Sequence, residues 1–79
     1  MQNCNLVASF SEKASLGQRI HAARVLAGYR NLYEFAVVIN LSASTLSRIE
    51  RNMTEPSFEV VVKIALETQL PLGFFINEN

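Results

Sequence analysis

Residues 42–51, Ser-Ala-Ser-Thr-Leu-Ser-Arg-Ile-Glu-Arg, combine small hydroxyl side chains with arginine at helical spacing. Leu46 and Ile49 are three residues apart and mark one apolar face of a helix. Most of the other side chains lie off that face and can form hydrogen bonds. Ser44 and Arg48 share the outer face. Such a face suits hydrogen bonding to base edges and to phosphates.

A second apolar stripe lies directly before this segment. Its members, at helical spacing, are Phe35, Ala36 and Ile39. Two short helices, over residues 32–39 and 43–51, are therefore expected to pack against each other across a tight turn. Ser42 is a good N-cap for the second of them. A helix that opens with small polar side chains after such a turn is suited to entering a DNA major groove.

The rest of the chain predicts three further helices and no strand. Ser15 and Gln18 have the spacing of a capping box, which begins a helix over residues 16–27. A fourth helix starts after Pro56 and reaches Thr68. The short last helix is expected to turn three apolar side chains inward, namely Leu72, Phe75 and Ile76. We therefore predict an all-α fold, a compact five-helix bundle.

The formal charge of the chain sums to zero, but the charges are unevenly distributed. Residues 1–51 carry six basic and three acidic side chains, whereas residues 52–79 carry one basic and four acidic ones. A basic first part is compatible with one side that faces DNA, with modest nonspecific affinity and a shallow salt dependence. Ordinary solvated charge is the alternative interpretation.

Side chains for catalysis or metal binding are scarce. Cys4 cannot form an internal disulfide, and together with the single histidine, His21, it provides too few ligands for a structural zinc site. His21 is expected at the surface or at the boundary of the core. No carboxylate pair has the spacing for acid–base chemistry, and no glycine-rich phosphate loop occurs. We expect no enzymatic activity, no metal and no cofactor.

No apolar run approaches the roughly 18 residues that cross a bilayer, and no basic segment precedes residues 6–10 as it would in a signal peptide. A soluble, cytoplasmic protein without a membrane partner is expected. The 79 residues make one domain, and a core of this size is marginal unless the chain oligomerises. Residues 1–14 form an N-terminal arm, frayed or ordered against a partner, and residues 15–79 form the domain.

The run of residues 42–51, with residues 16–20 and 27–28 ahead of it and residues 56–58 behind it, resembles the lambdoid phage repressor and Cro type of helix-turn-helix domain, the XRE family. The resemblance covers residues 15–76. It implies a repressor-like bundle in which the second and third helices form the helix-turn-helix, and a sequence-specific DNA-binding regulator of transcription.

The resemblance also implies roles for single residues. An arginine in the first helix of the family pairs with a glutamate at the end of the third, and the matching residues are Arg24 and Glu50. An exposed pair of little energetic value is the alternative. The base-contacting positions of the family fall on Ala43, Ser44 and Arg48, with Thr45 as a supplement. Arg48 suits guanine, or else clamps a phosphate. Phosphate-contacting positions fall on Asn31, Ser42 and Arg51.

The chain departs from the family pattern at several positions. Leu32 stands where many members have glutamine, so Tyr33 is expected to contact a phosphate instead. The link between the first two helices is one residue longer, which puts Arg30 near the DNA backbone. Asn52 and Gln69 replace glycines after the third and fourth helices, and Gln69 adopts a left-handed conformation poorly.

Several apolar side chains are left over once the core positions are filled. We expect them to form a dimer or partner surface, with Leu6, Val7 and Phe10 of the arm joining Leu66, Phe74, Val60 and Val62. A two-fold homodimer would bind an inverted-repeat operator in double-stranded DNA. In the absence of a sensor domain, an antirepressor or toxin protein is the expected inducer. A phage-type repressor is the favoured function; an antitoxin, or an interaction module that keeps the fold, is the alternative.

Overall fold

The computed structural model describes residues 14–76, which form four α-helices, one short 3-10 helix and no strand. The elements are α2 (Leu16–Leu26), α3 (Leu32–Val38), α4 (Ala43–Glu50), α5 (Phe58–Thr68) and η1 (Leu72–Phe74). The all-α prediction holds for this part of the chain. The five-helix count is not confirmed, because the predicted short last helix is a three-residue 3-10 helix. Residues 1–13 of the predicted arm, with Leu6, Val7 and Phe10, lie outside the described residues.

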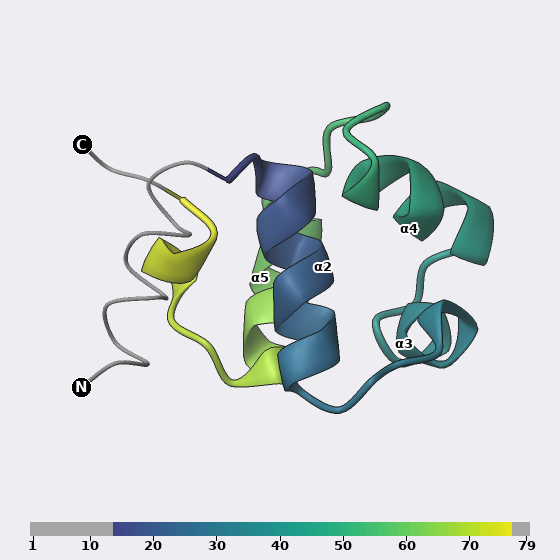
Figure 1. The fold of residues 1–79 in the computed structure, drawn as a ribbon, viewed down its shortest axis with the longest axis horizontal. Helices are drawn as coiled ribbons and strands as arrows, with labels where there is room; N and C mark the ends of the chain where they lie inside the picture. Colours follow the sequence, from purple (N-terminus) through teal and green to yellow (C-terminus); the bar gives the residue numbers. More distant parts are fainter. Residues whose placement is uncertain (1–13, 77–79) are drawn as a thin grey trace.

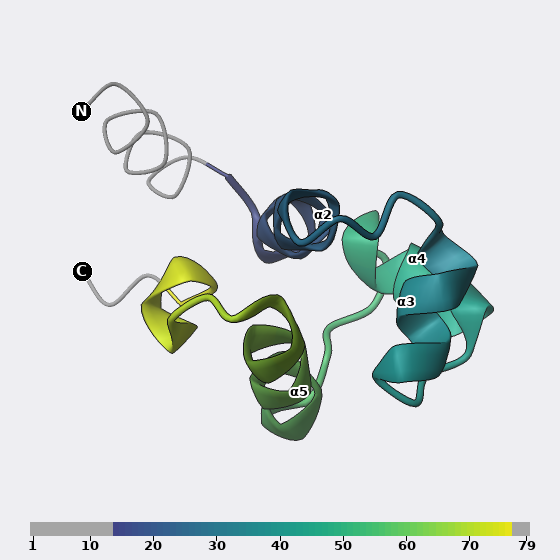
Figure 2. The same ribbon diagram turned by 90° about the horizontal axis from the view of Figure 1, so that it is seen from below.

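The helices are arranged around α2 and α5 (Figure 1). Both views place α3 and α4 together on one side of these two helices and η1 on the other side (Figures 1 and 2). The turn of residues 39–42 joins α3 directly to α4, as expected for a helix-turn-helix. The two helices therefore form a unit at one end of the molecule.

Each α-helix begins at a side chain that accepts a backbone hydrogen bond. The caps are Ser15, Asn31, Ser42 and Ser57. At Ser15 the capping box is complete, because the backbone N–H of Ser15 donates to Gln18 Oε1 over 2.9 Å. A cap of this kind contributes about 0.5–2 kcal/mol. These local bonds fix where the helices start.

Gln69 ends α5 in the left-handed region, with φ of 60°. From the sequence, Gln69 was expected to adopt this conformation poorly. Two backbone bonds support it: the N–H of Gln69 donates to Leu66 O over 3.3 Å, and the N–H of Leu70 donates to Ala65 O over 3.2 Å. This pattern closes the helix as a Schellman motif does, and Leu70 packs against the core.

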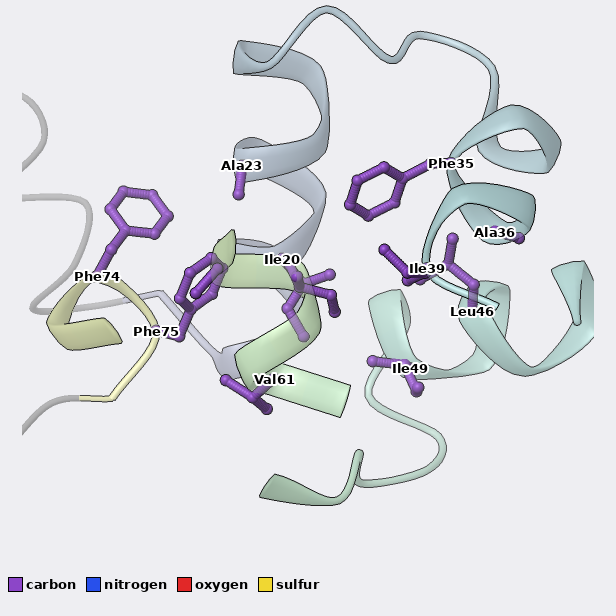
Figure 3. Packing of buried hydrophobic residues seen from close by; sticks show 12 residues of the cluster. Ile20, Ala23, Phe35, Ala36, Ile39, Leu46, Ile49, Val61, Phe74 and Phe75 are labelled. Atoms are coloured by element: carbon purple, nitrogen blue, oxygen red, sulfur yellow. The ribbon is translucent and has the colours of Figure 1, made fainter. Parts of the chain in front are cut away.

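The core lies between α2, α3, α4 and α5 (Figure 3). Its largest fully buried side chains are Ile20, Phe35, Leu46 and Ile64. All four lie on the apolar stripes of their helices, at the 3.6-residue period that the sequence shows. Phe35 of α3, Ile39 directly after it and Leu46 of α4 all belong to the buried core, so the apolar stripes of the helix-turn-helix meet there (Figure 3).

The C-terminal segment corrects three predictions. Phe74, predicted on an exposed partner surface, is buried at 7%, and its ring meets that of Phe75 edge to face with centroids 5.2 Å apart. Leu72 and Ile76, predicted to face inward, are exposed. The reason is that the 3-10 turn has three residues per turn, so the inward positions of an α-helix do not apply. Arg19 Nη1 donates to Phe75 O over 3.2 Å and fixes this turn against α2.

The start of α2 approaches the end of α4 closely at Gly17. A Cβ at this position would lie 2.6 Å from Ile49 O and 2.7 Å from Glu50 O. The N–H of Gly17 donates to Asn52 Oδ1 over 3.0 Å, and Asn52 Nδ2 donates to Ser15 Oγ over 2.8 Å. Backbone contact and side-chain hydrogen bonds thus set the distance between the two helices.

Gly17→Ala is expected to lower the free energy of unfolding by roughly 1–3 kcal/mol, because the methyl group overpacks rigid backbone atoms. Gly73→Ala is the matched control, since a Cβ at Gly73 meets nothing within 4 Å. Urea unfolding of both variants measures the difference. Equal unfolding midpoints would contradict the close approach.

Candidate nucleic-acid interface

The outer face of α4 carries the residues predicted to contact bases. Ser44 and Arg48 are exposed, whereas Ala43 and Thr45 are half-buried. Leu46 and Ile49 are buried on the opposite face, so the helix is amphipathic. The structure therefore presents one hydroxyl and one guanidinium, a helical turn apart, to the solvent.

The N-terminal end of α4 is exposed to solvent, and Ser42 is its N-cap. The N–H of Thr45 donates to Ser42 Oγ over 3.1 Å, and the hydroxyls of Ser42 and Thr45 lie 2.8 Å apart. Backbone N–H groups at such an end carry partial positive charge and attract anions. A phosphate near Ser42 would meet both the hydroxyl and the helix end.

The five residues predicted to contact phosphates are all exposed, namely Asn31, Tyr33, Ser42, Arg51 and Arg30. Asn31 caps α3 through a 2.8 Å bond that its Oδ1 accepts from the N–H of Tyr33. Arg51 Nε lies 3.4 Å from Ser47 O and keeps its guanidinium at the end of α4. Arg30, just before α3, and Arg51, at the end of α4, are both exposed, and an exposed guanidinium is suited to phosphate contacts.

Arg24 and Glu50 form a bidentate ion pair between α2 and the last residue of α4. Arg24 Nε lies 2.8 Å from Glu50 Oε2, and Nη2 lies 3.2 Å from Oε1. The two side chains are 6% and 7% exposed. Arg24 Nη1 also donates to the carbonyl oxygens of Tyr29 and Arg30 over 2.8 and 2.9 Å. One guanidinium thus connects α2, α4 and the link that leads into α3.

His21 joins this pair, a contact that was not predicted from the sequence. Its Nδ1 lies 2.9 Å from Glu50 Oε1 and 3.2 Å from Arg24 Nη2. His21 precedes Arg24 by three residues, which places both on one face of α2. That spacing was the available signal. The location of His21 at the surface agrees with the expectation, because its side chain is 56% exposed.

Tyr29 connects the link between α2 and α3 to α5. Its hydroxyl donates to Glu67 Oε2 over 2.6 Å. This hydrogen bond, together with burial and the negative charges of Glu67 and Glu34, raises the pKa of the Tyr29 hydroxyl above its ordinary value. The bond spans 38 residues, and no local pattern in the sequence announces it.

The fold and the exposed α4 face agree with a comparison of the chain with known families. The family described as helix-turn-helix matches residues 20–75. The chain belongs to the XRE, or Cro/C1-type, helix-turn-helix family. Its function class is that of a DNA-binding regulator of transcription. Comparisons with curated proteins and with solved structures gave no match.

Two further observations describe the helix-turn-helix domain. Within residues 14–76, every helix is too short or too polar to span a bilayer. Over the same residues, no three His, Cys, Asp or Glu side chains gather closely enough to bind a metal ion.

Arg24→Ala and Glu50→Ala are each expected to lower the free energy of unfolding by about 3–5 kcal/mol, because each leaves a buried charge without its partner. The double variant should lose less than the sum. Urea unfolding of all four proteins measures the coupling, with an osmolyte such as trimethylamine N-oxide added equally if a variant is marginal.

His21→Ala serves as the control for this cycle. The exposed imidazole should contribute less than about 1 kcal/mol, as surface ion pairs do. Additive losses for Arg24→Ala and Glu50→Ala would show that the two side chains are energetically independent.

Proposed function

We propose that this helix-turn-helix protein is a repressor of the phage or prophage type, which binds an inverted-repeat operator as a homodimer. The observation that carries the proposal is the outer face of α4, where Ser44 and Arg48 are exposed one turn apart beside an exposed helix N-terminus. A helix that enters a major groove needs hydrogen-bonding side chains on its outer face and a packed inner face. The outer face of α4 offers a hydroxyl and a guanidinium, and its inner face is packed in the core.

In the proposed complex, Arg48 supplies the main base contact. Its planar fork matches O6 and N7 of guanine, a contact that contributes about 1–3 kcal/mol of discrimination. Ser44 and Thr45 add hydroxyl contacts, and Ala43 offers its methyl group to thymine. Thr45 is already held by the Ser42 hydroxyl, so little side-chain entropy is lost when it binds.

The phosphate contacts come from the start of α3 and from both ends of α4. Asn31 and Tyr33 belong to the start of α3, Ser42 to the start of α4, and Arg51 to its end. Arg30 lies in the link that Arg24 holds through two carbonyl oxygens. These residues would fix the register of α4 on the duplex without selecting a sequence.

An inducing protein of the antirepressor kind is proposed to release the operator by covering the DNA-binding or the dimer surface. An antitoxin that binds its toxin is the second candidate function. The observation that favours a protein partner is the exposure of Leu66 and Val38, at 74% and 45%, which line the same hollow. Large apolar side chains gathered on a surface are typical of protein interfaces.

Selection of bound sequences from a random pool of DNA tests the proposed function. An inverted repeat of two half-sites, about one helical turn apart, is the expected result. Recovery of sequences with no common site would contradict the proposal and favour an interaction module that keeps the fold.

Arg48→Ala is expected to relax the preference at one base pair in each half-site, because Arg48 is the long donor of the reading set. Binding to the selected site and to each single-base variant measures the preference. A profile identical to that of the wild type would remove Arg48 from base reading and assign it to the phosphates.

Arg51→Ala should weaken binding to all of these sites about equally and lower the salt slope by about one, as the loss of one phosphate contact does. The measurement is the dissociation constant as a function of salt concentration. A loss that depends on the sequence would show that Arg51 contacts a base.

A further inference from the structure

The C-terminal end of α3 and the outer side of α5 form a hollow apolar surface, away from the α4 reading residues. A cavity of about 270 Å³ is lined by Val38, Ile39, Asn40, Lys63, Leu66 and Glu67. A second cavity of about 390 Å³ lies along the same helix and is lined by Val62, Ala65, Leu66, Gln69, Leu70 and Leu72. Leu66 belongs to both, so it forms a ridge between two hollows.

The side chains around this ridge are unusually open to solvent for apolar residues. Leu66 is 74% exposed, and Val38, which lines the first cavity, is 45% exposed. Neither cavity includes Ser44, Arg48 or the start of α4. This surface therefore shares no residue with the proposed DNA-reading face of α4.

The charges beside the ridge are arranged in a self-complementary way. Lys63 precedes Leu66 by three residues and Glu67 follows it by one, so the cation and the anion lie one turn apart on the same side of α5. A two-fold axis between two antiparallel α5 helices reverses this order. Lys63 of each copy then faces Glu67 of the other, and each Leu66 lies toward the hollows of the facing helix.

We propose that a second copy of this chain packs against this surface, through antiparallel α5 helices with two Lys63–Glu67 ion pairs. The inference rests on the proposed function, which requires a dimer, and it names the interface of that dimer. It replaces part of the surface expected from the sequence: Leu66 and Val62 remain, whereas Phe74 is in the core and Val60 packs against it.

Glu67 can form the intermolecular pair while it keeps its bond to Tyr29. The tyrosine hydroxyl donates to Oε2, and a carboxylate has about four acceptor sites on its two oxygens. Glu67 therefore connects the dimer contact to Tyr29, which lies next to Arg30 in the link between α2 and α3.

Charge reversal tests the proposal directly. Lys63→Glu places two pairs of glutamates across the axis, and Glu67→Lys places two pairs of lysines there. Each variant alone should dimerise at least about tenfold more weakly than the wild type in sedimentation equilibrium at low salt. An equimolar mixture of the two variants should recover the dimer, because both contacts then join opposite charges. Failure of the mixture to recover would overturn the interface.

Two controls separate the pair from other effects. Tyr29→Phe removes the hydrogen bond to Glu67 without a change of charge and should leave the dimer intact. Leu66→Ser should shift the protein to monomer, whereas Phe58→Ser should not, although Phe58 is 64% exposed on the same helix and lines neither cavity. Loss of the dimer in Phe58→Ser alone would overturn the proposal and place the contact at the start of α5.

The wild-type protein distinguishes this inference from the proposed function. A monomer in sedimentation that still selects a DNA site would overturn the interface and leave the surface to a different protein. A dimer that responds to the charge reversals but selects no DNA site would support the interface and contradict the repressor.

Discussion

The structure depends on the placement of one guanidinium, that of Arg24. Its nitrogen atoms contact the carboxylate that ends α4, the imidazole of His21, and two carbonyl oxygens of the link into α3. Glu50 occupies the C-terminal end of α4, where the partial negative charge of the last carbonyl groups disfavours a carboxylate. The positive charge of Arg24 compensates for this position. The ion pair therefore stabilises a carboxylate at an otherwise unfavourable helix end and holds the end of α4 against α2.

The same arrangement explains why so small a domain holds α4 rigidly. Along its inner face α4 is packed through Leu46 and Ile49, and at its end it meets Gly17, Arg24 and the side-chain bonds of Asn52. Apolar contacts alone hold the position of α4 weakly, because side chains of similar size can pack in several arrangements. Hydrogen bonds and ion pairs depend on direction, so they select one of these packing arrangements. Packing supplies most of the stability, and the polar contacts determine the orientation of α4.

Much of the fold was predictable because its signals are local. The caps at Ser15 and Ser42 and the apolar stripe of α4 depend on residues within one or two turns, and these helices start where the sequence indicates. The exposure of Ser44 and Arg48 follows from the same period. The inward turn of Phe74 was not predictable in this way, because it depends on a 3-10 geometry set by contacts with distant helices.

The candidate site shows the same division. The family resemblance indicated Arg24 and Glu50, and the structure brings them together. The contact between Tyr29 and Glu67, and that between Gly17 and Asn52, join residues 38 and 35 positions apart. Such pairs arise from the way the helices cross, which one sequence does not specify. Apolar residues left over after core assignment were also a poor guide: of the seven expected at the surface, four lie among the described residues, and two of these pack into or against the core.

The exposure of Ser44 and Arg48 on a helix fixed from its other side has a consequence for evolution. In the proposed mode of DNA binding, mutations at these two positions change what the helix recognises while they leave Leu46, Ile49 and Glu50 in place. Surface substitutions of this kind alter stability by only a few tenths of a kcal/mol, within about 0.5 kcal/mol of neutral. Under the proposed function, descendants of such a chain can change to new operators without first acquiring compensating changes in the core.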